Sequence, residues 1–341
     1  MLETDQVQFS RREDVGDVVL NRPEAHNALT LDMIEAIHRQ LALWAADPKV
    51  SGVVFKGAGG KAFCAGGDVR ALYEAKQAGD AKFLEAFYRR EYQLNYRIAT
   101  YPKPTVAVMD GIVMGGGAGI AMNCQHRIAT DNSHFAMPEC KIGLFPDVGA
   151  GYFLNRCPGE IGMFLALTGV ALRAPGMNFA GLATAFVPDD RVDFITPALL
   201  DRLSMPFAAA PLGSIRPMID QVFGLPSIEE IFNILKVRGG NWAGETLGMM
   251  RGHSPTSLKV TYAHMRRSRG QKLADVLKAE FRLSQHFMAG KEFFEGVRAI
   301  VIDKDQQPAW RPSDLKEVED AEVTRYFAAV PGIEEWASAK D

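Results

Sequence analysis

Two glycine-rich stretches constrain this chain more than any other feature of its sequence. The stretch MGGGAGIAMNC, from Met114 to Cys124, places three consecutive glycines and a fourth, Gly119, directly before an apolar run. A second stretch, GAGGKAFCAGGD at residues 57–68, follows a β-branched run. Because glycine inside an element costs about 0.5–1 kcal/mol relative to alanine, something must approach this backbone closely, or the chain must bend there as other residues cannot. A phosphate and a developing oxyanion are the two candidates.

The order of apolar runs predicts an α/β protein. Residues 6–21 contain the turn signal EDVGD and favour a β-hairpin. Thr30 is placed to cap a helix in which apolar residues recur at helical spacing up to Trp44, and another helix is expected from Val69. Strands that alternate with helices are typical of α/β organisation. The other predicted strands are VSGVVFKG (50–57), KPTVAVMDG (103–111), HRIAT (126–130) and HFAM (134–137).

The last part of the chain is expected to be mostly helical. A stretch richer in proline and glycine, SMPFAAAPLGSIRP, begins at residue 204 and suggests a boundary near residue 205. We therefore divide the chain into a core at residues 1–205 and a helical region at residues 206–341. Within that region KLADVLKAEFRLSQHFM places one set of residues along a single helix face, namely Leu273, Leu277, Phe281, Ser284 and Met288.

Charge and cysteine content narrow the class of protein. The net charge of −3 does not favour nucleic acid as a partner. The four cysteines form no CxxC pair, and the acidic N-terminus lacks the features of a signal or transit peptide. The longest weakly polar run, from Gly111 to Met122, is too short to span a bilayer. These observations predict a soluble cytoplasmic protein that binds no membrane.

Several common kinds of site are excluded by their missing residues. The glycine cluster is neither a Walker A motif nor GxGxxG, since Ile120 stands where the last glycine is needed. No HExxH motif suggests a metal site, and no serine lies in G-x-S-x-G. Two loops that each join a strand to a helix could instead aim backbone N–H groups at one oxyanion. Tight strand-to-helix turns explain either loop alone, but two such loops in succession favour the oxyanion hypothesis.

Two acidic residues follow shortly afterwards in AMPECKIGLFPDVGAG. Glu139 and Asp147 each come directly after a proline and lie among apolar residues. Burial in apolar surroundings raises the pKa of a carboxyl group toward the range that proton transfer needs. The alternative is that these are ordinary acids that cap a helix or pair with Arg156 or Lys141. Their closeness to a candidate oxyanion site favours a functional role.

These motifs together resemble the crotonase superfamily of coenzyme A thioester enzymes. The segments FCAGGDV, MGGGAGIAM and FAMPECKIGLFPDVGAGYFL carry the resemblance, and NRPEAHNAL and YPKPTVAVMDG fit it. The resemblance implies a spiral of ββα units and a substrate that is an acyl-CoA thioester. It also implies an oxyanion hole formed by the backbone N–H groups of Gly67 and Gly116, with Glu139 and Asp147 as the catalytic acids.

Within that superfamily the chain is similar to the 3-hydroxyisobutyryl-CoA hydrolases of valine catabolism, over residues 6–318. Asp147 stands where enoyl-CoA hydratases usually have glycine, and the first catalytic glutamate of the hydratases would fall at Gly119. The C-terminal stretches SPTSLKVT, EFRLSQHFM and EGVRAIVIDKDQQPAWRP resemble the hydrolase tail. The resemblance therefore implies thioester hydrolysis, in which Glu139 either attacks the carbonyl or activates water.

The same resemblance implies further binding residues. Glu91 corresponds to a substrate-binding glutamate, although by itself it reads as a solvated helix residue; Gly66, Asp68 and Gly115 are also expected beside the substrate. Coenzyme A enters as part of the substrate, so no separate cofactor is expected. A homo-oligomer is implied by the family, although the extended C-terminal region leaves the oligomeric state open. The basic run HMRRSRGQK has charges that could meet the phosphates of coenzyme A, but we favour its interpretation as a solvated face.

Two other functions compete with hydrolysis. One is a different reaction of the superfamily, such as hydration or isomerisation of an enoyl-CoA. The other is binding of acyl-CoA without catalysis.

Overall fold

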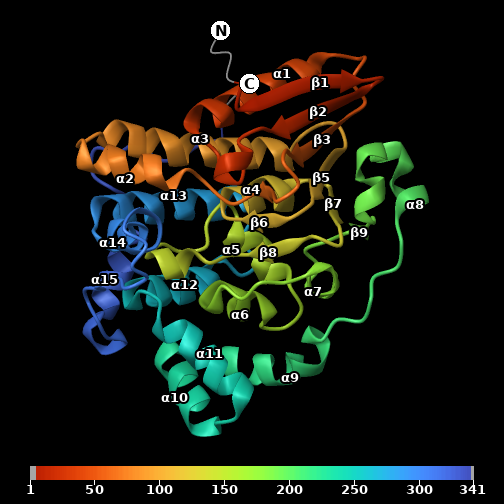
Figure 1. Cartoon of the computed structure of the whole chain (residues 1–341). Coiled ribbons are helices and arrows are strands. Elements are labelled where there is room, and N and C mark those ends of the chain that lie inside the picture. The colour runs from red at the N-terminus through yellow and green to blue at the C-terminus, as the bar shows by residue number, and fades with distance from the viewer. Residues whose placement is uncertain (1–4, 339–341) are drawn as a thin grey trace.

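Two sheets form the centre of the molecule in a computed structural model that describes residues 5–338 (Figure 1). The larger sheet has the strand order β1-β2-β3-β5-β7-β9, and it is parallel except for the antiparallel pair β1–β2. The smaller sheet has the order β4-β6-β8 and is parallel throughout. The strands are β1 (Val7–Arg12), β2 (Val15–Leu20), β3 (Gly52–Gly57), β4 (Ala62–Cys64), β5 (Thr105–Met109), β6 (Ile112–Met114), β7 (His126–Ala129), β8 (His134–Ala136) and β9 (Ala185–Phe186).

The strands alternate between the two sheets along the chain. In the pairs β3–β4, β5–β6 and β7–β8, the first strand joins the larger sheet and the second joins the smaller sheet. Gly111, with a φ of +82°, turns the chain between β5 and β6 so tightly that a side chain there would overlap the backbone of Lys61. Helices follow β4 and β6. The arrangement is a spiral of ββα units and confirms the predicted fold class.

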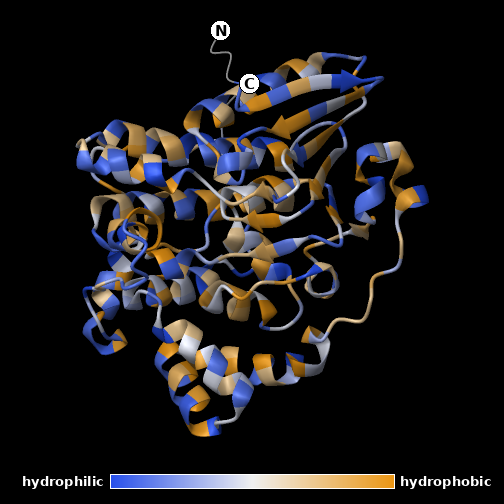
Figure 2. Cartoon of the chain, in the orientation of Figure 1, coloured by the Kyte–Doolittle hydropathy of each residue, from blue (hydrophilic) through white to orange (hydrophobic). Residues whose placement is uncertain are grey.

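Helices cover this centre on several sides, and the long outer ones mix hydrophobic with hydrophilic residues along their length (Figure 2). The helix α3 packs against α1, α4 and α13, while α9, α10 and α11 lie at the end of the molecule far from β1 (Figure 1). Within residues 5–338, no helix is long and apolar enough to cross a membrane. The α-helices are α1 (Leu31–Ala46), α2 (Val69–Gln77), α3 (Ala81–Ala99), α4 (Gly116–Asn123), α5 (Ala150–Phe153), α6 (Ile161–Thr168), α7 (Ala174–Phe179), α8 (Leu200–Leu203), α9 (Leu212–Phe223), α10 (Ile228–Arg238), α11 (Asn241–Arg251), α12 (Pro255–Ser268), α13 (Leu273–Ala289), α14 (Glu292–Val297) and α15 (Asp320–Arg325).

Most of the predicted elements are present at the expected places. The hairpin is β1–β2, and Thr30 accepts a hydrogen bond from the amide of Met33 as the cap of α1. The C-terminal region is mostly helical, as predicted. The strands β4 and β6 were not predicted, because both are short and lie within or directly beside the glycine-rich stretches, which favour loops. The boundary near residue 205 stays a prediction, and α12, α13 and α14 pack against α6, α3 and α2 of the preceding region.

The close contact between α4 and β4 explains why residue 117 of α4 is glycine, and this explanation can be tested. A Cβ atom on Gly117 would overlap the carbonyl oxygen of Cys64. We expect Gly117→Ala to lower the free energy of unfolding by about 1–3 kcal/mol, because the backbone of β4 must move. Urea unfolding followed by circular dichroism measures this change.

Gly244→Ala is the matched control, because Gly244 lies within α11 and no atom lies within 4 Å of its added Cβ. That variant should gain about 0.5–1 kcal/mol from the lower backbone entropy of the unfolded chain. An unchanged urea midpoint for Gly117→Ala would contradict the packing explanation.

Candidate active site

A cavity of about 210 Å³ lies where the three strands of the smaller sheet end. The strands β4, β6 and β8 are adjacent and parallel, so their carboxyl ends meet at one edge. The segments that directly follow these strands supply most of the glycine and acidic residues of the cavity. Val301, from the short π-helix η6 (Arg298–Ile302), also lines it. The residues of the cavity that sequence analysis had singled out are Gly66, Gly67, Glu91, Gly115, Gly116, Glu139 and Asp147.

The two glycine-rich loops bring two backbone amides close together. Gly67 follows β4, and Gly116 is the first residue of α4, where an amide has no partner within the helix. A Cβ atom built on Gly116 would lie 3.3 Å from the nitrogen of Gly67. Among the described residues, neither amide donates a backbone hydrogen bond. The pair is therefore available to one oxygen atom at the cavity.

The conformation of the preceding residues explains why glycine occurs in both loops. Gly66 has a φ of +126°, and Gly115 has a φ of +47° with a ψ of −123°. Residues with a side chain rarely adopt such a backbone. Gly67 and Gly116, which follow these turns directly, both line the cavity.

Two glutamates reach the cavity from different elements. Glu139 begins the short 3-10 helix η2 (Glu139–Ile142) after β8, and its side-chain atom Oε2 is buried without a hydrogen-bond partner. Glu91 lies on the buried face of α3, and its Oε1 also has no partner. The interpretation of Glu91 as a solvated helix residue is wrong, because only 3% of it is exposed. Two buried carboxyl oxygens without partners indicate a site that expects a polar ligand.

Asp147 lies in a sharp turn on the same cavity. The hydroxyl of Tyr92 donates a hydrogen bond of 2.7 Å to its Oδ2. The next residue, Val148, has a φ of +54°, which is rare for a β-branched side chain and costs on the order of 1–3 kcal/mol. The carboxylate of Glu280 accepts hydrogen bonds from the amides of Gly149 and Gly151. The turn is therefore held by tertiary contacts, since its local backbone preference opposes it.

Burial raises the pKa of all three acids of the cavity. The pKa of Asp147 rises from 3.8 to about 7, although the hydroxyl of Tyr92 favours its charged form. The pKa values of Glu91 and Glu139 are also raised, first by burial and then by the charge of Asp147. No ion pair with a lysine or arginine reaches any of the three within residues 5–338. Carboxyl groups with raised pKa values can exchange protons near neutral pH.

The structure shows no ion pair between Glu139 or Asp147 and the basic residues Arg156 and Lys141 within residues 5–338. The guanidinium of Arg156 lies over the ring of Tyr152, and Lys141 forms no ion pair with either acid in the described chain. Asp68 does not line the cavity, since its carboxylate caps α2 and pairs with Arg22 at 3.0 Å. Its role in binding substrate stays a prediction.

The position of Gly119 is closed to any side chain. A Cβ atom there would lie 2.7 Å from Cβ of Val148 and 2.9 Å from Nδ2 of Asn95. A glutamate at this place therefore has no room. The resemblance places the first catalytic glutamate of the hydratases at Gly119. The packing around Gly119 gives a physical reason why this chain has no glutamate there.

The basic run at residues 264–272 is solvated only in part, since Arg267 and residues 269–272 are exposed whereas His264, Met265 and Ser268 are buried. Arg266 and Arg269 both form ion pairs with Glu160, and Arg267 lies over the ring of Phe327. His264 is 1% exposed. These side chains attach α12 to the rest of the molecule.

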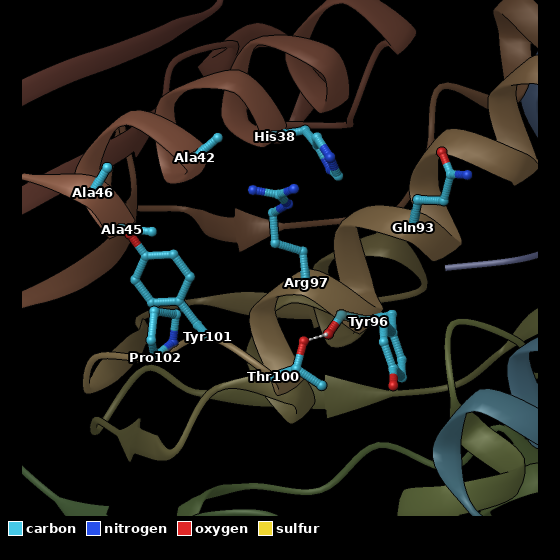
Figure 3. A pocket seen from close by; sticks show the side chains of 10 residues that line it. All are labelled: His38, Ala42, Ala45, Ala46, Gln93, Tyr96, Arg97, Thr100, Tyr101 and Pro102. Carbon is cyan, nitrogen blue, oxygen red and sulfur yellow. Dashed lines mark hydrogen bonds between the residues drawn. The ribbon is translucent and has the colours of Figure 1, made fainter. Parts of the chain in front are cut away.

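A larger cavity of about 380 Å³ lies between α1 and α3, and His38 and Arg97 extend into it (Figure 3). No acid and no glycine is among the residues that line it. Within residues 5–338, no group of three or more histidine, cysteine or acidic side chains is arranged to hold a metal ion. The smaller cavity is thus the better candidate for catalysis.

Sequence analysis missed three side chains that support this site. Tyr92, His264 and Glu280 are buried and lie behind Asp147 or its turn. The sequence does contain one indication that Glu280 is buried: it falls on the apolar face of α13 beside Leu277. A charged residue on such a face has to find a buried partner.

Comparison with known proteins supports the same assignment of fold and family. A family model described as enoyl-CoA hydratase/isomerase matches residues 15–327. The 3-hydroxyisobutyryl-CoA hydrolase, mitochondrial, of Rattus norvegicus is 43% identical and covers 96% of this chain and 90% of its own length. The protein of the same name from Homo sapiens is 41% identical and covers 96% of this chain and 89% of its own length.

Solved structures show the same architecture. A carnitinyl-CoA dehydratase from Mycobacterium thermoresistibile has a TM-score of 0.94 at 36% identity and covers 99% of this chain and 100% of its own. An enoyl-CoA hydratase from Rhodobacter sphaeroides 2.4.1 has a TM-score of 0.89 at 38% identity, and it covers 95% of this chain and 97% of its own.

The names of the relatives correct one expectation. The 3-hydroxyisobutyryl-CoA hydrolases are each described as mitochondrial, so our prediction of a cytoplasmic protein is wrong. The four buried free cysteines fit any reducing compartment, and they could not distinguish one such compartment from another.

The raised pKa of Asp147 makes stability depend on pH in a defined direction. Between pH 3.8 and about 7 the folded protein binds one more proton than the unfolded chain, so this group's contribution to stability falls as the pH rises through that window. Asp147→Asn removes the cost of burying an ionised carboxylate in the folded protein. Its amide oxygen still accepts the hydrogen bond from the hydroxyl of Tyr92. The variant should exceed the wild type in unfolding free energy at pH 8 by roughly 1 kcal/mol or more, because one pKa unit corresponds to about 1.4 kcal/mol.

Urea unfolding at pH 5 and pH 8 measures this effect, and the gain should be clearly smaller at pH 5, because it disappears only near pH 3.8, where the unfolded chain also binds the proton. Asp190→Asn is a surface control that should change stability little at either pH. An equal gain for Asp147→Asn at both pH values would contradict the assignment of the raised pKa to this carboxyl.

Proposed function

The chain belongs to the enoyl-CoA hydratase/isomerase family, and from that premise we propose that it hydrolyses the thioester bond of 3-hydroxyisobutyryl-CoA. The products are 3-hydroxyisobutyrate and coenzyme A. Relatives with this activity in their names are 41–43% identical over nearly the whole chain. One observation carries the proposal: Glu139 lines the same cavity as Gly67 and Gly116, and its Oε1 would lie 3.4 Å from a Cβ atom on Gly115, the residue directly before Gly116.

The amides of Gly67 and Gly116 hold the carbonyl oxygen of the thioester. As the carbon becomes tetrahedral, this oxygen gains negative charge, and both N–H groups stabilise that charge more strongly than they stabilise the ground state. The amides are already oriented by their loops, so no reorganisation is needed at the moment of reaction. Loss of one such donor costs roughly 3–4 kcal/mol of transition-state stabilisation in known enzymes.

Glu139 starts the reaction by one of two routes. In the first, its carboxylate attacks the thioester carbon, a C–O bond forms as the C–S bond breaks, and water then hydrolyses the resulting anhydride. In the second, Glu139 takes a proton from a water molecule whose oxygen attacks the same carbon. In both routes the thiolate of coenzyme A leaves and takes a proton from an acid of the site.

Asp147 and Glu91 surround the rest of the acyl group. Asp147 titrates near neutral pH, so it can supply the proton that the leaving thiolate needs. The partnerless Oε1 of Glu91 lies near the amide of Gly116, where it can accept a hydrogen bond from the 3-hydroxyl. A polar acyl group thus satisfies buried oxygens that an apolar acyl group would leave without partners.

Several finer statements belong to the same proposal. The reaction is a step of valine catabolism, as in the hydrolase branch that the sequence resembles. Coenzyme A takes part as a portion of the substrate, and no further cofactor is required. A homo-oligomer stays a prediction from the resemblance.

Hydration of an enoyl-CoA is the second candidate, because two similar solved structures are described as a dehydratase and a hydratase. Hydration by two carboxylates needs a second acid near Glu139, and the usual position at Gly119 has no room for one. Asp147 would have to replace it. Crotonyl-CoA followed in parallel with the thioester assay separates the two reactions.

Replacement of Glu139 tests the central carboxylate. Glu139→Gln keeps the size of the side chain and removes its ability to act as a nucleophile or base. We expect kcat for 3-hydroxyisobutyryl-CoA to fall by a factor on the order of 10³ or more, with the fold unchanged. Release of the free thiol of coenzyme A measures the rate.

Glu160→Gln is the control for this variant, since Glu160 lies outside the cavity and pairs with Arg266 and Arg269. It should keep nearly full activity. Thiol release that persists in Glu139→Gln would remove Glu139 from the mechanism, and hydration of crotonyl-CoA without thiol release would favour the second candidate.

The buried acids also predict selection for the 3-hydroxyl group. Isobutyryl-CoA has the same branched carbon skeleton without the hydroxyl, so binding it leaves buried carboxyl oxygens without partners. We expect its kcat/KM to be lower by a factor on the order of 10⁴, as for other sites that bind a hydroxyl. Parallel thiol-release assays with the two substrates measure the ratio, and a ratio near one would contradict recognition of the hydroxyl by these acids.

A further inference from the structure

We propose that Glu280 is a positioning residue that holds the turn at residues 147–151 and thereby aims Asp147 into the cavity. This inference rests on the proposed function, in which Asp147 acts on the substrate. Glu280 lies on α13, more than a hundred residues after the turn, and it does not line the cavity. It therefore acts on the reaction only through the backbone that it binds.

The contacts of Glu280 are those of a clamp on this turn. Its Oε2 accepts a hydrogen bond of 2.7 Å from the amide of Gly149, and its Oε1 accepts one of 3.1 Å from the amide of Gly151. The side chain is fully buried. Two backbone donors on one buried carboxylate fix both the position and the direction of the segment that follows Asp147.

A second layer of side chains fixes the carboxylate in turn. Nε2 of His264 lies 3.1 Å from Oε1 of Glu280. Since a carboxylate only accepts hydrogen bonds, this nitrogen donates, and Nδ1 on the other side of the ring lies 3.2 Å from the hydroxyl of Ser268. A Cβ atom on Gly151 would lie 2.6 Å from Nε2 of His264, so the turn is pressed directly onto this cluster.

The turn needs such a clamp because its backbone is unfavourable. Val148 has a φ of +54° and Gly149 a φ of +92°. Within the turn the amide of Ala150 donates to the carbonyl of Asp147 at 2.8 Å, and the side chains of Asn155 and Asn123 donate to the carbonyls of Gly151 and Val148. Glu280 is the acceptor for the amides of Gly149 and Gly151, so without it both amides lose their partner and the turn that places Asp147 is held less firmly.

A purely structural role for Glu280 makes a different prediction. Glu280 could simply join α13 to the short helix α5 for stability. Its negative charge, however, also raises the pKa of Asp147, so a variant without that charge alters the titration of the acid. The other titratable groups that face Asp147 are Tyr88, Tyr92 and Glu91 from α3 and Glu139 from η2.

The experiment compares the wild type with Glu280→Gln and with the control Glu160→Gln, all as full-length protein. The first readout is amide hydrogen exchange at Gly149 and Gly151, which should become about tenfold faster in Glu280→Gln. The second is kcat for 3-hydroxyisobutyryl-CoA, which should fall about tenfold or more while KM changes little, because the loss lies in transition-state positioning. The alkaline limb of the pH–kcat profile, along which Asp147 loses the proton that it donates, should move to lower pH.

A second variant keeps the proposal testable if Glu280→Gln does not fold. His264→Phe retains the aromatic ring beside Phe145 and removes the donor to Glu280. It should produce smaller changes in exchange and in kcat in the same directions, and it keeps the charge of Glu280. Glu160→Gln should leave the exchange, kcat and pH profile unchanged.

The outcomes separate this inference from the proposed function. If folded Glu280→Gln keeps the wild-type exchange at Gly149 and Gly151, the clamp is refuted. If exchange rises while kcat and the pH profile stay those of the wild type, Glu280 is structural and the positioning role is overturned. If the wild type releases no thiol, the proposed function fails, and the exchange measurement alone decides whether Glu280 holds the turn.

Discussion

The parallel pairing of β4, β6 and β8 is the constraint on which the site depends. Because all three strands run in one direction, their ends fall at one edge of the smaller sheet, and segments far apart in sequence meet there. Gly67 follows the first strand, Gly116 the second and Glu139 the third. A shift of any strand by one residue would turn its loop away from the cavity, so the register of this small sheet sets the geometry of the chemistry.

The cavity contains buried acids and backbone angles that lower the stability of the folded protein. Three carboxyl groups share one buried cavity with no ion pair to a cation in the described chain, and two of their oxygens have no hydrogen-bond partner. Gly66, Gly115 and Val148 adopt backbone angles that most residues avoid. Such features lower stability, and they persist only because the surrounding packing over-determines them. In the proposed function, the 3-hydroxyl of the substrate donates a hydrogen bond to one of these carboxyl oxygens, while its carbonyl oxygen accepts from the amides of the glycine loops.

The helices after residue 205 provide much of that surrounding packing. The helix α14 lies so close to η2 that side chains on Gly143 or Gly296 would overlap the opposing backbone. Both α12 and α13 contact α5, where Glu280 meets the turn of Asp147. Val301 also reaches the cavity wall. The C-terminal region is therefore part of the active-site structure, and each acid that follows the smaller sheet is supported by it.

The sequence by itself determined the strand–helix alternation, the glycine loops and the acids Glu139 and Asp147, because periodicity, turn chemistry and motif spacing are local properties. It could not reveal the short strands β4 and β6, because the apolar and polar residues around them do not distinguish a strand from the adjoining glycine-rich loops. Nor could it place Glu91 inside, since a helix shows which face is apolar without showing what covers it. Only the tertiary structure decided that Glu280 meets the turn beyond Asp147 and that Val148 and Asn95 close the space at Gly119. The physical reason is that these contacts join residues far apart in the chain, so no local pattern records them.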